Sequence, residues 1–269
     1  MKILRYLPLY SVSLYFFSLP CFAHEFWLEP DKYKIAPSQK VSISIRIGEN
    51  FKGESWPFIR DSFYKFVYTS QGRNNKILGL DGDDPAAQLT LNSEGLAIIT
   101  QYAKPSDIEF NDWNKFKTYL DSEGLEHLVQ EHTRLGFPKT KIKELYSRCA
   151  KLLLQVGHTP KGRDIYSGMP LELIAEKNPY QLQDKEKLPI KLLFNGRPLE
   201  GAQIIKISKK TGVRVKGPRT DESGRAWVQL PNSGPWLLNA VHIIPHKPVS
   251  DAHWFSYWAS LTFDKGTAF

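Results

Sequence analysis

Apolar and polar residues alternate in several short runs near the start of the chain, a pattern typical of strands with one buried face. The alternation is regular over residues 41–47 and weaker over 66–69, and a short apolar run covers 96–99. A segment rich in glycine and aspartate, 79–85, separates two of these runs as a turn. Together they predict an N-terminal β-domain over residues 24–105.

The spacing of apolar residues changes after residue 105. Intervals of three and four, typical of one face of a helix, connect two series: Phe110, Trp113, Phe116 and Leu120, then Ile142, Leu145, Tyr146, Cys149, Leu152, Leu153 and Val156. Gly157 follows the second series, where a helix C-cap glycine would stand. We therefore predict a helical insertion over residues 106–157, with one helix spanning 142–156.

Strand-like segments return in the last part of the chain. They are separated by glycine-containing turns about ten residues apart, as in β-sandwiches, and cover 171–174, 190–194, 202–207, 226–228, 236–241 and 254–263. These segments predict a C-terminal β-sandwich domain over residues 158–269. The expected fold class is mainly β, with two β-sandwich domains of immunoglobulin or prealbumin type and the helical insertion between them.

Residues 1–23 have the three parts of a secretory signal peptide: a basic start with Lys2 and Arg5, an apolar stretch, and a small residue, Ala23, at the end. A membrane-spanning helix needs about 20 apolar residues, whereas prolines and polar residues interrupt this stretch. Cleavage at the lipoprotein position, Cys21, is disfavoured because small residues do not precede it. We expect cleavage between Ala23 and His24 and a periplasmic or secreted protein.

Composition excludes several classes of function. The formal net charge is +8, but the lysines and arginines are scattered among acidic residues and form no long basic run. Nucleic-acid binding is therefore not expected. Cleavage of the signal would leave one cysteine, Cys149, which we expect to be a buried apolar residue. Neither a glycine-rich phosphate loop nor a serine–histidine–aspartate pattern stands out. We therefore predict a protein that is not an enzyme.

His24 is the main candidate for binding chemistry. As the first residue of the mature chain it would offer a metal ion both its α-amine and its imidazole Nδ1. Nitrogen donors suit Ni²⁺, Co²⁺, Cu²⁺ and Zn²⁺, so this chelate alone does not identify the metal. Both nitrogens must be unprotonated to bind, which predicts weaker binding below about pH 7. The adjacent Glu25 would add an oxygen ligand or orient the imidazole.

Further histidines gather near the C-terminus. His242, His246 and His253 lie within twelve residues, on either side of a loop that follows the 236–241 segment. This density makes His246 and His253 additional candidate ligands. His127 and His132 are five residues apart, so they would not share one helix face, and we expect them to face solvent.

Six segments of the chain, in order, resemble the DUF4198 family: residues 24–30, 146–151, 176–180, 220–225, 234–238 and 256–263. The resemblance implies an exported protein with a terminal histidine and two β-domains, similar to periplasmic components of nickel and cobalt uptake systems. It also implies a histidine at position 242, which makes His242 the second expected ligand. One departure is His253, which precedes Trp254 where the family usually has aspartate.

The first hypothesis is therefore an exported protein that captures Ni²⁺, or Co²⁺, through His24 and His242 and delivers it to a transporter in the inner membrane. Two alternatives stay open. One is a copper oxidase that acts on polysaccharide with His24 and a second histidine bracing the ion. The other is a metal-free β-sandwich module for adhesion or carbohydrate binding. In the shared-site hypothesis the N-terminus must fold against the strand that ends at His242.

Overall fold

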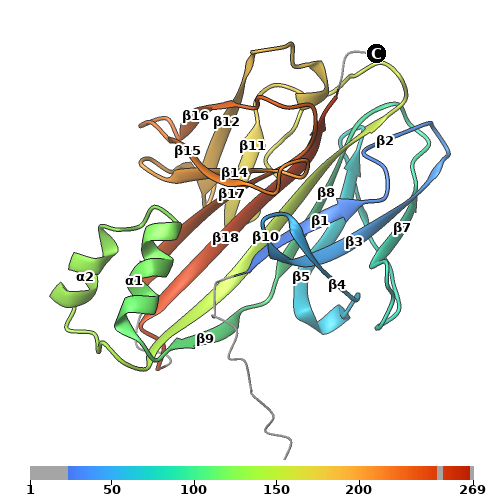
Figure 1. The fold of residues 1–269 in the computed structure, drawn as a ribbon. Coiled ribbons are helices and arrows are strands. Elements are labelled where there is room, and N and C mark those ends of the chain that lie inside the picture. The colour runs from blue at the N-terminus through green and yellow to red at the C-terminus, as the bar shows by residue number, and fades with distance from the viewer. Residues whose placement is uncertain (1–23, 247–250, 267–269) are drawn as a thin grey trace, which may run out of the picture.

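The computed structural model describes residues 24–246 and 251–266. The predicted signal segment, residues 1–23, lies outside the described residues, which begin at His24. The largest element is a ten-stranded sheet (Figure 1). Its strands run in the order β15 (Arg214–Arg219), β14 (Gln203–Ser208), β17 (Gly234–Pro245), β18 (Trp254–Lys265), β10 (Ile142–Val156), β8 (Gly95–Ala103), β5 (Phe63–Ser70) and β6 (Arg73–Lys76), while β2 (Lys34–Ile35) and β9 (Ser106–Phe110) also pair with β10.

Two smaller sheets of four strands each pack against this large sheet (Figure 1). The first contains β1 (Glu25–Pro30), β3 (Lys40–Glu49), β4 (Lys52–Trp56) and β7 (Ala87–Thr90). The second contains β11 (Leu171–Ala175), β12 (Lys187–Phe194), β13 (Arg197–Pro198) and β16 (Arg225–Gln229). Short 3₁₀ turns cover Arg60–Ser62 and Pro179–Gln181. The mainly β class predicted from the sequence is confirmed.

The two small sheets lie on opposite faces of the large sheet. Thr262 of β18 donates its hydroxyl hydrogen to the carbonyl of Leu28 in β1, at 2.7 Å. Lys151 of β10 instead contacts Glu172 of β11. Leu152, the neighbour of Lys151, is the register partner of Thr262, and successive residues of a strand point to opposite faces. We call these the β1 face and the β11 face.

Two helices, α1 (Trp113–Ser122) and α2 (Leu128–Arg134), lie at one end of the molecule (Figure 1). Asp112 caps α1 by accepting a hydrogen bond from the Asn114 N–H at 2.7 Å. The helices bury Phe116, Leu120 and Leu128 in a cluster with Val241 and Trp254 of the large sheet. Within the described residues neither helix has the length and apolar character needed to cross a membrane.

The predicted helix over 142–156 is wrong, because these residues form β10. The strand is covered on both faces, so its apolar residues do not alternate with exposed polar ones. Its buried polar residues recur at intervals of three and four, which resembled the polar side of a helix: Glu144, Ser147, Lys151 and Gln155. Ser106–Phe110 is likewise a strand, β9, so the helical part of the predicted insertion is confined to residues 113–134.

The large sheet takes strands from all three regions that the sequence analysis separated. β2, β5, β6 and β8 come from residues before 105, β9 and β10 from 106–157, and four strands from the last region. β10 and β18 pair in parallel from Glu144 with Trp254 to Leu152 with Thr262. The division into domains at 105 and 157 stays a prediction, but these regions share one sheet.

His132 is buried rather than solvent-facing, contrary to the expectation from the sequence. Its Nδ1 accepts a hydrogen bond from the Trp254 indole N–H at 3.0 Å, and its Nε2 lies 2.9 Å from the carbonyl oxygen of Pro138. Because an indole N–H only donates, the imidazole proton must sit on Nε2. Burial lowers the pKa of His132, so this histidine is neutral and structural.

Candidate functional site

A pocket of about 250 Å³ lies beside the first residues of β1. Asn50, Tyr119 and four charged side chains line it. The charged side chains are those of Glu25, Glu49, Glu123 and Arg214. These residues come from the start of β1, the end of β3, the end of α1 and the start of β15. The pocket is therefore built on the β1 face by segments that are distant in the sequence.

Glu25 is held in place by the tight turn that connects β3 and β4. Asn50 and Phe51 have positive φ angles of 55° and 61°, as a two-residue hairpin turn requires. The turn directs the Phe51 N–H to Glu25 Oε2, at 3.1 Å, and the Phe51 ring packs edge-on against Trp27. A left-handed conformation is unfavourable for a bulky residue, and burial of Phe51 together with this hydrogen bond offsets the cost.

The charge balance of the pocket depends on Arg214. Its Nη2 lies 2.6 Å from Glu123 Oε1 and its Nε lies 3.5 Å from Glu25 Oε1. Burial raises the pKa of Glu25 to about 7, against the opposing effects of the Phe51 N–H and of Arg214. Burial also raises the pKa of Glu123. The Glu123 Oε2 atom is buried without a hydrogen-bond partner. The single guanidinium of Arg214 is therefore shared between two buried carboxyl groups, those of Glu25 and Glu123.

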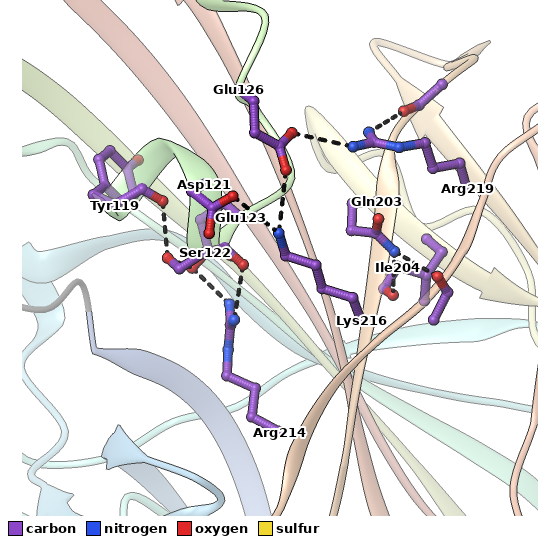
Figure 2. A network of polar contacts seen from close by, with 12 residues as sticks. Tyr119, Asp121, Ser122, Glu123, Glu126, Gln203, Ile204, Arg214, Lys216 and Arg219 are labelled. Carbon is purple, nitrogen blue, oxygen red and sulfur yellow. Dashed lines mark hydrogen bonds and ion pairs between the residues drawn. The ribbon is translucent and has the colours of Figure 1, made fainter. Parts of the chain in front are cut away.

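A row of basic side chains on β15 attaches the helical segment to the large sheet (Figure 2). Arg214 also donates to the carbonyl of Ser122 at 2.8 Å. Lys216 Nζ lies 3.1 Å from Glu126 Oε1, and Arg219 Nη2 lies 3.3 Å from Glu126 Oε2. Arg214, Lys216 and Arg219 all belong to this one strand. The network fixes the end of α1, and with it Glu123, over the pocket.

His24 lies next to this pocket, directly before β1. Its Nε2 is 3.8 Å from Glu49 Oε1, and the side chains of His24 and Glu49 are 51% and 48% exposed. Glu49 ends β3, which pairs with β1 through Glu25 and Gly48. The structure thus brings together two predicted site residues, His24 and Glu25, with a third group, Glu49, that the sequence analysis did not select.

His242 does not join them. Leu237 of β17 is the register partner of Thr262 and shares the β1 face with it. His242 lies five residues further along an unbroken strand and therefore points to the β11 face. There its ring packs edge-on against Phe194 of β12, with the ring centroids 4.5 Å apart, and burial lowers its pKa to about 4. The large sheet lies between His242 and His24, so the expected shared site is not formed.

His246 and His253 are close to each other but not to His24. The His246 N–H donates to the carbonyl of His253 at 2.9 Å. The Lys143 N–H donates to His253 Nδ1 at 3.0 Å, and the His253 ring lies edge-on to Phe137. These bonds close the end of the large sheet. Within residues 24–246 and 251–266 no three or more His, Cys, Asp or Glu side chains are grouped so as to hold a metal ion.

Sequence reasoning missed Glu49, Glu123 and Arg214. Glu49 follows an alternating strand and Glu123 follows a helix, positions that carry no chemical signature. Arg214 and Lys216 do alternate in the sequence, which places them on one face of a strand. The expectation for Cys149 is confirmed: this residue is buried, and burial raises the pKa of its thiol to about 12.

The fold and the site define a mainly β protein with a carboxylate-lined pocket beside the first residue of its first strand. The chain belongs to the family described as "Domain of unknown function (DUF4198)", whose profile matches residues 21–244. No curated protein matches the chain. A solved structure, "D0-D1 domain of Intimin", is 9% identical, with a TM-score of 0.23, and the alignment covers 88% of this chain and 96% of that one.

Proposed function

We propose that this protein is exported and captures Ni²⁺, or Co²⁺, through His24 at its mature N-terminus, then delivers the ion to a membrane transporter. The observation that carries the proposal is the approach of His24 Nε2 to Glu49 Oε1, at 3.8 Å, next to the carboxylate-lined pocket. The resemblance of the chain to exported proteins of nickel and cobalt uptake favours these two ions as the cargo.

The arrangement suits a terminal chelate because the two imidazole nitrogens have separate tasks. Nδ1 and the α-amine would bind the ion, while Nε2 lies 3.8 Å from Glu49 Oε1 and is free to face this carboxylate. Metal-binding histidines commonly donate their second ring N–H to a carboxylate, which orients the ring. His24 alone supplies two ligand atoms, so a group of three side chains is not required. Glu25 is engaged by Arg214 and the Phe51 N–H and acts as a neighbouring charge.

Exposure of the site favours transient capture over permanent storage. Half of the His24 side chain is accessible, so a transporter has a path to the ion. Arg214 is a fixed positive charge in the pocket and disfavours a closed, all-carboxylate cage. The copper oxidase alternative requires a second histidine at the ion. His242, His246 and His253 make their contacts elsewhere, which favours the capture function.

The decisive experiment is calorimetric titration of the exported protein with Ni²⁺ and with Co²⁺, after its N-terminus has been determined by intact-mass measurement. We expect one equivalent to bind per chain that begins at His24. Adding one glycine before His24 removes the α-amine from the chelate and should abolish this binding. Glu49→Gln should weaken it about 10-fold, the lower end of the usual effect of an orienting carboxylate.

His158→Ala is the matched control, because this histidine is also exposed but lies at the far end of β10. It should bind the metal with native affinity. Equal affinity of the native and glycine-extended chains would contradict the chelate. Native affinity in Glu49→Gln would contradict only the role of Glu49.

A further inference from the structure

Lys151, Asp164 and Glu172 form a cluster on the β11 face of the large sheet whose three side chains have no exposed surface. Lys151 Nζ lies 2.5 Å from Glu172 Oε1, 3.1 Å from Asp164 Oδ1 and 3.1 Å from the carbonyl oxygen of Ile165. Lys151 stands in the middle of β10 and Glu172 in β11, while Asp164 lies in the segment between them. The function proposed above does not use this cluster.

The cluster places one cation and two carboxyl groups out of contact with water. Burial of uncompensated charge is costly, so such groups tend to become neutral. Burial raises the pKa of Asp164, with Lys151 acting in the opposite direction. Glu172 accepts hydrogen bonds from the Ser167 and Met169 N–H groups, at 2.7 and 3.0 Å. These donors stabilise a carboxylate at Glu172, whereas burial favours the protonated form of Asp164.

We propose that Lys151 and Asp164 join through an intramolecular amide bond, with Glu172 as the group that moves the protons. In the first step the Lys151 ammonium gives a proton to the Glu172 carboxylate. The free amine then attacks the Asp164 carboxyl carbon and forms the C–N bond. Glu172 returns its proton to the departing hydroxyl, and the nitrogen loses its second proton to the Glu172 carboxylate. One water leaves, and the nitrogen keeps one hydrogen.

The geometry supports each role. Lys151 Nζ is within hydrogen-bond distance of both partners, which is the close approach that makes an intramolecular reaction fast. Asp164 Oδ2 accepts the Ala175 N–H at 2.9 Å, a bond that stabilises the negative charge arising on this oxygen during attack. The Ile165 carbonyl would accept the remaining N–H of the product. Exclusion of bulk water protects the amide from hydrolysis.

The test is peptide mapping of the purified native chain by mass spectrometry under denaturing conditions. Trypsin cleaves after Arg148, Lys161, Arg163 and Lys177, so the amide bond predicts one branched product in which residues 149–161 are joined to 164–177. Its mass should equal the sum of the two peptides minus one water, and cleavage after Lys151 should be absent. Separate peptides, with cleavage after Lys151, would overturn the proposal and leave a buried ion-paired cluster.

Two variants test the roles of the residues. Lys151→Arg lacks the nucleophile and should yield unlinked peptides, whereas linkage of 164–177 in this variant would contradict the assignment to Lys151. Glu172→Gln keeps the size of the side chain but cannot accept the proton, so it too should be unlinked; a linked product would exclude Glu172 as the proton carrier. Lys65→Arg is the control, since Lys65 contacts the nearby Ser167 carbonyl, and it should remain linked. The native chain decides the proposal even if a variant fails to fold.

Discussion

On each face of the large sheet one basic side chain contacts two buried carboxyl groups, but the two clusters differ in their access to water. On the β1 face Arg214 serves Glu25 and Glu123, and these groups line a pocket. On the β11 face one lysine serves two carboxyl groups, and all three side chains are sealed from solvent. The comparison shows that charge composition alone does not determine what a cluster does. Access of water determines how strongly its charges interact, and therefore how much free energy is lost when one charged partner is removed.

The identity of the cation adds to this difference. A guanidinium stays protonated and forms several fixed hydrogen bonds, so Arg214 can hold Glu25, Glu123 and the Ser122 carbonyl without reacting. A lysine amine can lose its proton when it is buried and then becomes a nucleophile. The open cluster is therefore suited to positioning, and the sealed cluster to a single internal reaction.

The largest effect is expected from Lys151→Met. The substitution removes the amine, and with it the proposed amide bond to Asp164, and leaves the two carboxyl groups buried, which should lower the free energy of unfolding by at least about 3–5 kcal/mol. Urea denaturation followed by circular dichroism measures this change. A loss below about 1 kcal/mol would mean that the sealed cluster behaves like an exposed ion pair, and the contrast between the two faces would disappear.

Arg214→Met should cost less, about 2 kcal/mol, because the pocket lets water replace part of the lost hydrogen bonding to Glu25 and Glu123. The same denaturation experiment applies. Arg219→Met is the control on the same strand, since Arg219 is 45% exposed and its loss should cost less than about 1 kcal/mol. If both arginine variants lose equally little, Arg214 does not compensate the pocket carboxylates.

Glu25 should make the stability depend on pH. Its pKa rises from 4.5 to about 7 on folding, so between these values the folded state binds a proton that the unfolded state does not. This contribution stabilises the protein below about pH 4.5 and is lost as the pH rises through 7. Glu25→Gln should reduce the decline by about 1 kcal/mol per pH unit, measured as urea midpoints from pH 5 to 7.5. An unchanged slope would show that Glu25 titrates normally.

The smallest effect is expected from Lys216→Met, the same substitution as at Lys151 but at a position 41% exposed. The ion pair of Lys216 with Glu126 should contribute about 0.5 kcal/mol. A double-mutant cycle with Glu126→Gln isolates this coupling energy from other effects of the two substitutions. A coupling energy above about 2 kcal/mol would instead make the attachment of the helical segment comparable with the sealed cluster.

The alternating strands of the chain were predictable because one of their faces meets a core, as in β3, where Val41, Ile43 and Ile45 are buried in turn. β10 could not be predicted as a strand, since neighbouring elements cover both of its faces and its polar residues are buried in contact with other polar groups. Local periodicity reports the environment of single residues, and it cannot reveal partners that arrive from distant segments. His132 was misjudged for the same reason, because its partner Trp254 lies more than a hundred positions away.

The candidate site shows the same division. His24 and Glu25 were identifiable because they lie at the expected start of the mature chain, where the α-amine and the imidazole of His24 can bind one metal ion together. The expectation that His242 would join them failed because a strand's register decides which face each side chain takes, and a shift of one residue would have reversed it. Glu49 and Arg214 reach the site only through the pairing of strands and could not be selected beforehand.

The parallel pairing of β10 with β18 has a consequence for how the chain acquires its structure. These two central strands are separated by about a hundred residues, and β17 and β8 flank them. High contact order of this kind slows folding, because the entropy of closing a long loop is lost before the contacts form. Ribosomal synthesis delivers β18 after every other described strand. Until Trp254–Lys265 are available, the parts of β10 and β17 that pair with β18 are open to pairing with strands of another chain.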